Sequence, residues 1–565
     1  MRLAKYWLVL ALAMAGMGGC SRYALRTPEP PPEPTDATAA TVYHVLAAEL
    51  ASHRGRLDEA FGHYVWLARS TRDVGAAEKA ARIGLHLNKN GDTLEASALW
   101  ASLDPGNTGA QQAKAIVFLR EGREQEAYEA LIALVELLEQ EGRNGYAGAS
   151  DVIKQAEAGE AGVAMMRRLV AREPKNGDAH YALALVLVAY KDLAGAVDSA
   201  QRSTRLNPGN ELAWLLLSRL YAMQGTGEAS GVALHDGLDR NPESQVLRLA
   251  YATWLVEAER LEEAYREFQR LEKKSPDNPD VIFSLGALAT DLEHWDAARR
   301  YWRRLIDRGK RVDQARYYLA LVEESTGHPR KALALYAEVE EGGLKLDAAV
   351  RSANILARQG DISGMRELIA QQRVLFPDHA VDLYLIEGEL LSDAGRHAES
   401  MAVYDTALKA FPGEEQLLYA RAMQGMRVDR VDILERDLRE LLAVNPDHAD
   451  ALNALGYTLA DLTDRYAEAL ELISRAFALK PDNPAILDSM GWVHYRLGNH
   501  EQALDFLQRA AARVQDSEIA AHLGEVLWIT GRQDDALRVW REALSHDPDN
   551  PNLRGVMERF RRVTP

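Results

Sequence analysis

The sequence predicts an all-α protein built as a solenoid of repeated helix pairs, and three observations support this. A pattern of small and large residues recurs about every 34 positions over residues 41–548, which is the period of a helix-turn-helix repeat. Ala, Leu, Glu and Arg dominate the segments, whereas the alternating Val, Ile and Thr runs that predict strands do not occur. No long low-complexity linker interrupts the chain after Thr41, so one elongated array fits better than several domains.

The last repeats show the spacing most clearly. Two short helices pack closely only where side chains are small, so Gly491 and Ala503 are predicted to lie where neighbouring helices nearly touch. About fifteen repeats can be aligned on this small residue of the second helix, at Ala60, Ala96, Ala127, Ala196, Ala264, Ala298, Ala332, Ala469, Ala503 and Ala536, with Ser230, Met365 and Ser400 as substitutes.

Prolines recur where each second helix is expected to end, because proline lacks the N–H that continues a helix. They stand at Pro174, Pro208, Pro242, Pro276, Pro377, Pro412, Pro446, Pro481 and Pro548. The match is weaker over residues 41–176, where the units of Ala60, Ala96 and Ala127 lack a proline at the expected place. Residues 142–162 are rich in Gly and Ala. They form either a frayed or bent junction between two sub-arrays or an ordinary degenerate repeat, and the sequence favours the degenerate repeat.

The order of the small and aromatic positions resembles the tetratricopeptide repeat. This resemblance implies a right-handed superhelical solenoid of about fifteen repeats over residues 41–548, followed by a C-terminal capping segment at 549–565. Proteins of this family present a concave surface to peptides or protein partners, so the resemblance also implies a binding role.

The first forty residues are expected to stay outside the fold. Arg2 and Lys5 precede an apolar run at residues 6–14, which is too short for the ~20 residues of a membrane span and is typical of a secretory signal. Residues 1–19 are therefore interpreted as a signal peptide. It ends before Cys20, the only cysteine, in a segment that resembles a bacterial lipobox. A plain signal peptide that happens to end near a cysteine is the alternative.

The lipobox resemblance implies that Cys20 is acylated and becomes the first residue of the mature protein. Ser21 occupies the position at which many inner-membrane lipoproteins carry Asp, so the family's sorting rule implies the outer membrane, with the protein facing the periplasm. Residues 20–40 would form a tether, because the prolines from Pro28 to Pro34 favour an extended polyproline spacer of ~3.1 Å per residue.

Charge and motifs narrow the functional class. The net charge of −18 becomes −20 once Arg2 and Lys5 are removed with the signal, which disfavours nucleic acid as a partner. The chain lacks GxGxxG, GxxxxGK[ST], HExxH, GxSxG and SxxK motifs, so an enzyme is not expected. The fifteen histidines are scattered, so neither a metal nor a cofactor is expected.

Candidate partner-binding residues come from the last three repeats. They occupy the second, fifth and ninth positions of the first helices, or lie one turn beyond, and are Asn453, Tyr457, Asp488, Trp492, Tyr495, Arg496, Glu525 and Trp528, with Asp450, Glu518 and Ala521 at the remaining positions. Exposed aromatic residues beside polar donors are typical of binding hot spots. The alternative is that Trp492 and Trp528 pack against the adjacent repeat.

Residues 452–461 and 487–498 carry a more specific sequence pattern than the general repeat. Together with the lipobox and the length of the array, they resemble the outer-membrane tetratricopeptide lipoproteins called LbcA. This resemblance implies a non-catalytic adaptor that binds a periplasmic carboxy-terminal-processing serine protease and its substrates, which include peptidoglycan hydrolases. A pilotin-like or exopolysaccharide-export scaffold is the runner-up, and a hydrolase with a hidden site is a third hypothesis.

Overall fold

The computed structural model describes residues 36–563, and side chains to residue 560. The described chain contains 31 α-helices, one short 3₁₀ helix and no strand, which confirms the all-α prediction. The predicted signal peptide, Cys20 and the proline-rich part of the tether lie outside the described residues. Helix α1 begins at Ala37, inside the predicted tether, because Asp36 caps it through a hydrogen bond from the Thr38 N–H.

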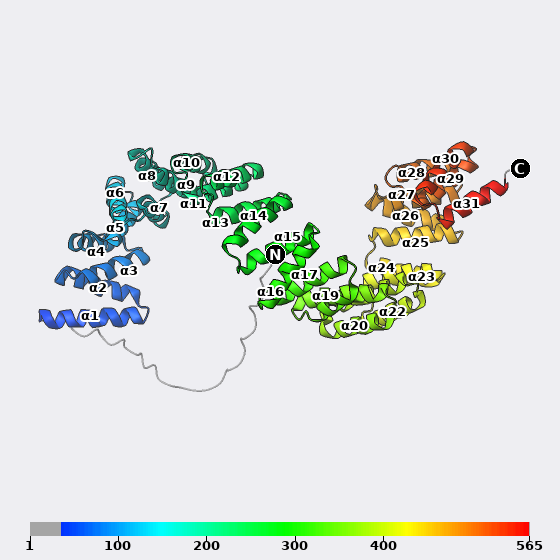
Figure 1. The fold of residues 1–565 in the computed structure, drawn as a ribbon, viewed down its shortest axis with the longest axis horizontal. Coiled ribbons are helices and arrows are strands. Elements are labelled where there is room, and N and C mark those ends of the chain that lie inside the picture. Colours follow the sequence, from blue (N-terminus) through cyan, green and yellow to red (C-terminus); the bar gives the residue numbers. More distant parts are fainter. Residues whose placement is uncertain (1–35, 564–565) are drawn as a thin grey trace, which may run out of the picture. The chain divides into compact units, whose positions relative to one another are not determined.

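The chain divides into two compact units, which end and begin at Glu267 and Phe268. Within each unit, successive helices lie side by side and contact their next neighbours (Figure 1). The helices of the first unit are α1 (Ala37–His53), α2 (Leu57–Thr71), α3 (Val74–His86), α4 (Asn90–Leu103), α5 (Thr108–Arg120), α6 (Glu124–Gln140), α7 (Gly145–Ala156), α8 (Gly159–Arg172), α9 (Gly177–Ala189), α10 (Leu193–Leu206), α11 (Glu211–Met223), α12 (Gly227–Arg240) and α13 (Gln245–Glu257), with α14 (Leu261–Lys274) carrying the boundary.

The second unit continues the same pattern of paired helices. It comprises α15 (Pro279–Asp291), α16 (Trp295–Asp307), α17 (Val312–Ser325), α18 (Pro329–Ala337), α19 (Gly342–Arg358), α20 (Ile362–Leu375), η1 (Pro377–His379), α21 (Ala380–Asp393), α22 (His397–Ala410), α23 (Glu415–Arg427), α24 (Val431–Val444), α25 (Ala449–Leu462), α26 (Tyr466–Leu479), α27 (Pro484–Arg496), α28 (His500–Ala511), α29 (Ser517–Ile529), α30 (Gln533–His546) and the single α31 (Pro551–Val563).

The recurrent prolines follow the ends of second helices, as the sequence predicts. The second helices α10, α24 and α26 each end two residues before a recurrent proline. Many first helices begin after a residue whose side chain accepts hydrogen bonds from the first turn, as Asn176, Asn483 and Asp516 do. Residues 142–162 contain α7 and the start of α8, and both helices pack on α9, so this segment is helical and not frayed.

The small-residue positions are buried where helices meet. Each of the ten aligned alanines is at most 3% exposed, and Met365, Ser400 and Ser230 are buried as well. Opposite them, glycines of the first helices leave room for large residues of the second helices. A Cβ on Gly491 would lie 2.5 Å from Leu507 Cγ and 3.1 Å from the Ala503 carbonyl oxygen, and one on Gly524 would lie 2.0 Å from Trp540 Nε1.

Replacing Gly491 with leucine should therefore destabilise the α27–α28 pair. The added side chain has to displace Leu507 and the backbone of α28, which is expected to cost about 1–3 kcal/mol or more of local unfolding free energy. Because solenoid repeats contact mainly their neighbours, limited proteolysis should begin near α27 while α15–α20 stay protected. A uniform loss of protection through the second unit would contradict nearest-neighbour packing.

Candidate functional site

The last repeats bring three first helices together to form a groove. Helices α25, α27 and α29 contact one another in sequence order, and their N-caps His448, Asn483 and Asp516 set a common register. A cavity of about 430 Å³ lies along them. This cavity, called the C-terminal groove below, is lined by Met426, Asn453, Ala454, Tyr457, Pro484, Ala485, Asp488, Ser489, Val514, Asp516, Glu518 and Ile519.

A buried pair of charged groups lies behind the groove. Nδ1 of His522 lies 3.0 Å from both carboxylate oxygens of Asp488, and the two residues are 8% and 5% exposed. Burial disfavours the imidazolium, but the hydrogen bond and charge of Asp488, helped by Glu518 and Asp461, outweigh burial and raise the pKa of His522. The pair therefore links α27 to α29.

Trp492 completes this buried cluster. Its ring stacks on His522 with centroids 4.1 Å apart, and its Nε1 donates a hydrogen bond of 3.1 Å to Asp461 of α25. Only 7% of Trp492 is exposed. The structure thus places this side chain inside the wall, packed against the neighbouring repeats, which is the alternative arrangement considered from the sequence.

Tyr457 spans two repeats along the groove. Its hydroxyl donates a hydrogen bond of 2.7 Å to Glu518, a residue 61 positions further along the chain. Burial, and then the charge of Glu518, raise the pKa of Tyr457, so the phenol stays protonated and remains a donor at physiological pH. The bond holds α25 and α29 at a fixed separation across α27.

The remaining predicted residues tie the end of the array together. Tyr495 donates a hydrogen bond of 3.0 Å to Glu525, and burial followed by the Glu525 charge raises the pKa of Tyr495 to about 12. Arg559 of α31 pairs with the same carboxylate. Arg496 donates to the Asp461 carbonyl at 2.9 Å and to a tyrosine hydroxyl at 2.8 Å. Trp528 stacks on Trp540, with centroids 5.7 Å apart.

Four of the residues named from the sequence, Asn453, Tyr457, Asp488 and Glu518, line the C-terminal groove. Five others, Trp492, Tyr495, Arg496, Glu525 and Trp528, lie outside its lining. Asp516 and Ile519 also line the groove, although the repeat spacing does not place them at the second, fifth or ninth position of a first helix. Asp516 could have been found, because it stands at the same N-cap position as Asn483 one repeat earlier.

A second groove of about 660 Å³ lies on α17, α19 and α21. Its walls include Arg351, whose Nε donates a hydrogen bond of 3.2 Å to the Tyr317 hydroxyl. Arg358 and Leu383 also line it. The first helices of the second unit therefore form a hollowed surface in two places.

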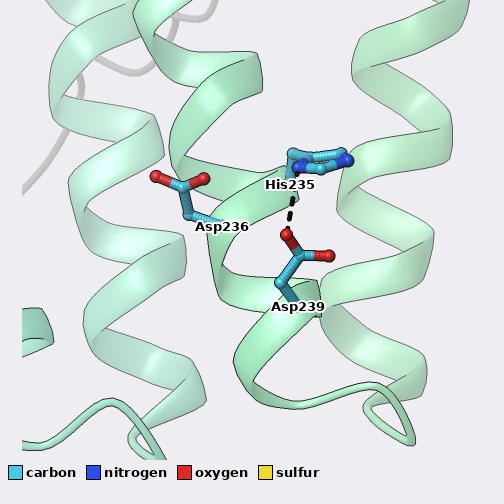
Figure 2. Close-up of side chains that lie close together, drawn as sticks. All are labelled: His235, Asp236 and Asp239. Atoms are coloured by element: carbon cyan, nitrogen blue, oxygen red, sulfur yellow. Dashed lines mark ion pairs between the residues drawn. The ribbon is translucent and has the colours of Figure 1, made fainter.

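One group of side chains has ligand atoms close enough to share a metal ion. His235, Asp236 and Asp239 lie on helix α12, where His235 Nδ1 and an Asp239 oxygen are 3.6 Å apart (Figure 2). All three residues are exposed to solvent. Binding there would have to compete with hydration of each ligand, and Asp239, the ion-pair partner of the imidazole, is itself exposed, so the group is more simply a solvated helix surface.

The His522–Asp488 pair predicts a pH dependence. A histidine whose folded pKa is raised stabilises the fold fully below its unfolded pKa of about 6.5, and this contribution is lost as the pH rises through the folded value. Amides of α27 and α29 should accordingly lose protection from hydrogen exchange, after correction for the intrinsic rate, as the pH rises through the raised pKa of His522. The Asp488→Asn variant should show a flatter profile. Identical profiles for the two proteins would contradict the assignment.

Comparison with family models finds tetratricopeptide-repeat matches at residues 159–211, 283–343, 435–484 and 462–525. Cellulose synthase operon protein C of Pseudomonas fluorescens is 24% identical over 429 residues, which are 63% of this chain and 33% of that protein. This chain therefore spans about a third of that relative. Among solved structures, the anaphase-promoting complex hetero-tetramer Cut9-Hcn1 is 15% identical and covers 92% of this chain and 96% of the compared chain, with a TM-score of 0.32.

A longer and more similar match is to the TPR repeat-containing protein PA4667 of Pseudomonas aeruginosa. The two proteins are 37% identical over 527 residues, which are 90% of this chain and 88% of the relative. The similarity thus extends into both units. The chain belongs to the family of tetratricopeptide-repeat (TPR) proteins.

Proposed function

We propose that this protein is a lipid-anchored periplasmic adaptor that binds a carboxy-terminal-processing serine protease and presents peptidoglycan hydrolases to it. The observation that carries the binding role is the C-terminal groove, a cavity of about 430 Å³ built by three successive first helices in a family of repeat proteins that bind other proteins. The choice of protease and hydrolases is supported by the resemblance of residues 452–461 and 487–498 to LbcA.

The adaptor needs no chemistry of its own. Holding protease and substrate on one scaffold raises the effective concentration of each for the other, so a single chain with two binding surfaces accelerates cleavage. The two grooves on first helices of the second unit offer separate places for such contacts. The catalytic residues belong to the protease in this proposal, and no cofactor takes part.

Affinity purification of the full chain from solubilised membranes tests the identity of the partners. The proposal expects a carboxy-terminal-processing protease and at least one cell-wall hydrolase, both identified by mass spectrometry. Recovery of polysaccharide-synthase or export subunits in their place would favour the runner-up, a scaffold for envelope assembly. That alternative is supported by the similarity to cellulose synthase operon protein C.

The anchor is part of the same proposal, with the protein held on the periplasmic face of the outer membrane by the acyl chains on Cys20. Among the described residues, no helix has both the length and the apolar character needed to cross a bilayer. Cys20→Ser should therefore shift the protein from the membrane fraction to the soluble periplasm while helicity remains unchanged. Retention of the variant in the membrane fraction would contradict anchoring through Cys20.

A further inference from the structure

We propose that the C-terminal groove receives an extended partner segment in which a lysine or arginine stands between apolar residues. This inference rests on the proposed function, because it specifies the chemistry of the partner segment that the scaffold holds. Three features of the groove support it: its apolar surface, its charge, and one polar atom in its wall that has no hydrogen-bond partner among the described residues.

The groove has apolar side chains that are exposed to solvent. Met426 and Val514 line it and are 45% and 41% exposed. The lining also includes Ala454, Pro484 and Ala485, whose side chains are short and apolar. Exposed apolar side chains gathered around one concavity are typical of a surface that buries a partner's apolar residues.

The charge of the groove is negative. Its lining residues include Asp488, Asp516 and Glu518 but no lysine or arginine. Asp488 contacts His522 behind the groove, whereas Asp516 and Glu518 are exposed and have no ion pair within the described residues. Both stand where a bound chain would run, so they favour a cationic residue and repel an acidic one.

The carboxylates of Asp516 and Glu518 are held in place, and each can still accept further hydrogen bonds. Oδ1 of Asp516 accepts hydrogen bonds from the backbone N–H groups of Glu518 and Ile519, and Oε1 of Glu518 accepts the Tyr457 hydroxyl. The second oxygen of each carboxylate accepts no bond from the described residues. An ammonium or guanidinium group supplies several N–H donors and suits a pair of oxygens arranged in this way.

Asn453, in the groove wall, has a side-chain oxygen that needs a hydrogen-bond donor. Its Oδ1 atom is shielded from solvent and has no hydrogen-bond partner within the described chain. A shielded carbonyl oxygen without a donor costs free energy until one arrives. A peptide backbone N–H or a cationic side chain can supply that donor, whereas a carboxylate cannot. The apolar surface, the charge and the orphaned acceptor therefore select the same occupant.

Fluorescence anisotropy on the purified full chain tests the inference with defined probes. The probe is a blocked, dye-labelled peptide of twelve residues with one lysine between leucines, and two sister peptides carry glutamine or glutamate at that position. The lysine peptide should bind about fivefold or more tighter than the glutamate peptide at low salt, and the preference should shrink as salt is added. Equal affinity for all three peptides would overturn the proposal.

Two conservative changes locate the preference in the groove. Asp516→Asn keeps a good N-cap residue, and Glu518→Gln keeps an acceptor for the Tyr457 hydroxyl, so the double variant should fold as the parent does. It should bind the lysine and glutamine peptides equally well. A matched double variant, Glu501→Gln with Asp534→Asn, removes two exposed carboxylates outside the groove lining and should keep the parent's preference. Loss of the preference in both double variants would show a long-range charge effect and overturn the assignment to the groove.

The experiments can contradict the proposed groove chemistry and the proposed adaptor function independently of each other. If the groove prefers the lysine peptide but no protease is retained by the chain, the chemistry of the groove stands and the proposed partner falls. If protease and hydrolase are retained while the three peptides bind alike, the adaptor stands and its contacts lie elsewhere, with the groove on α17, α19 and α21 as the next surface to vary.

Discussion

Replacing Arg421 with methionine is expected to destabilise the α23–α24 pair by about 3–5 kcal/mol, because it leaves a buried carboxylate without its main partner. Asp437 is completely buried, and Nε and Nη2 of Arg421 donate hydrogen bonds of 2.6 and 2.9 Å to its two oxygens. Arg436 also reaches Asp437 at 2.9 Å. Its side chain is 56% exposed, so it cannot replace both bonds from inside the repeat.

Hydrogen exchange of α23 and α24 amides measures this loss, with two variants as controls. Arg421→Met combined with Asp437→Leu removes both charges and should recover much of the stability, since apolar residues often replace a buried ion pair without loss. Arg430→Met breaks an exposed pair with Asp432 and should change little. An effect of Arg421→Met no larger than that of Arg430→Met would show that the buried pair is not what holds these helices.

The Trp540→Ala variant is expected to lose about 3–5 kcal/mol of local stability at the end of the array. Trp540 is fully buried, stacks on Trp528 and lies over Gly524, the residue whose missing Cβ makes room for its indole. Truncation leaves a cavity that the rigid helix pair α29–α30 cannot close by collapse. The loss should appear as faster proteolysis within α29–α31.

A double-mutant cycle separates this contact from general damage. Gly524→Ala alone should destabilise, because its Cβ would meet Trp540, whereas the same change in the Trp540→Ala background should cost little or improve stability. Additive effects of the two changes would contradict direct packing between them. Loss of protection in α15–α20 would contradict the expectation that each repeat depends mainly on its neighbours.

The fold was predictable because each repeat carries its own local signals. The aligned alanines, the recurrent prolines and the N-cap residues all act within one or two turns of helix, and each is found where its type indicates. The start of α1 at Ala37 was missed, since Asp36 stands in a segment whose prolines suggested an extended chain and its capping role shows only in the geometry.

The candidate site was predictable in part. Contacts between adjacent repeats join residues about one period apart, as in His522 with Asp488, separated by 34 positions, so the repeat length itself could have indicated that pair. The bond from Tyr457 to Glu518 spans 61 positions and depends on how three helices curve, which residue spacing does not specify. The burial of Trp492 likewise follows from the position of the His522 ring.

The adaptor proposal is tested most directly by the rate at which a purified carboxy-terminal-processing protease from the same organism cleaves a purified peptidoglycan hydrolase, with and without the full-length lipidated protein in vesicles. The account predicts that cleavage accelerates, that the acceleration rises and then falls as scaffold is added in excess over both partners, and that the Asp516→Asn, Glu518→Gln double variant gives less of it than the Glu501→Gln, Asp534→Asn control. An unchanged cleavage rate at every scaffold concentration, with neither protein retained on the vesicles, would contradict it.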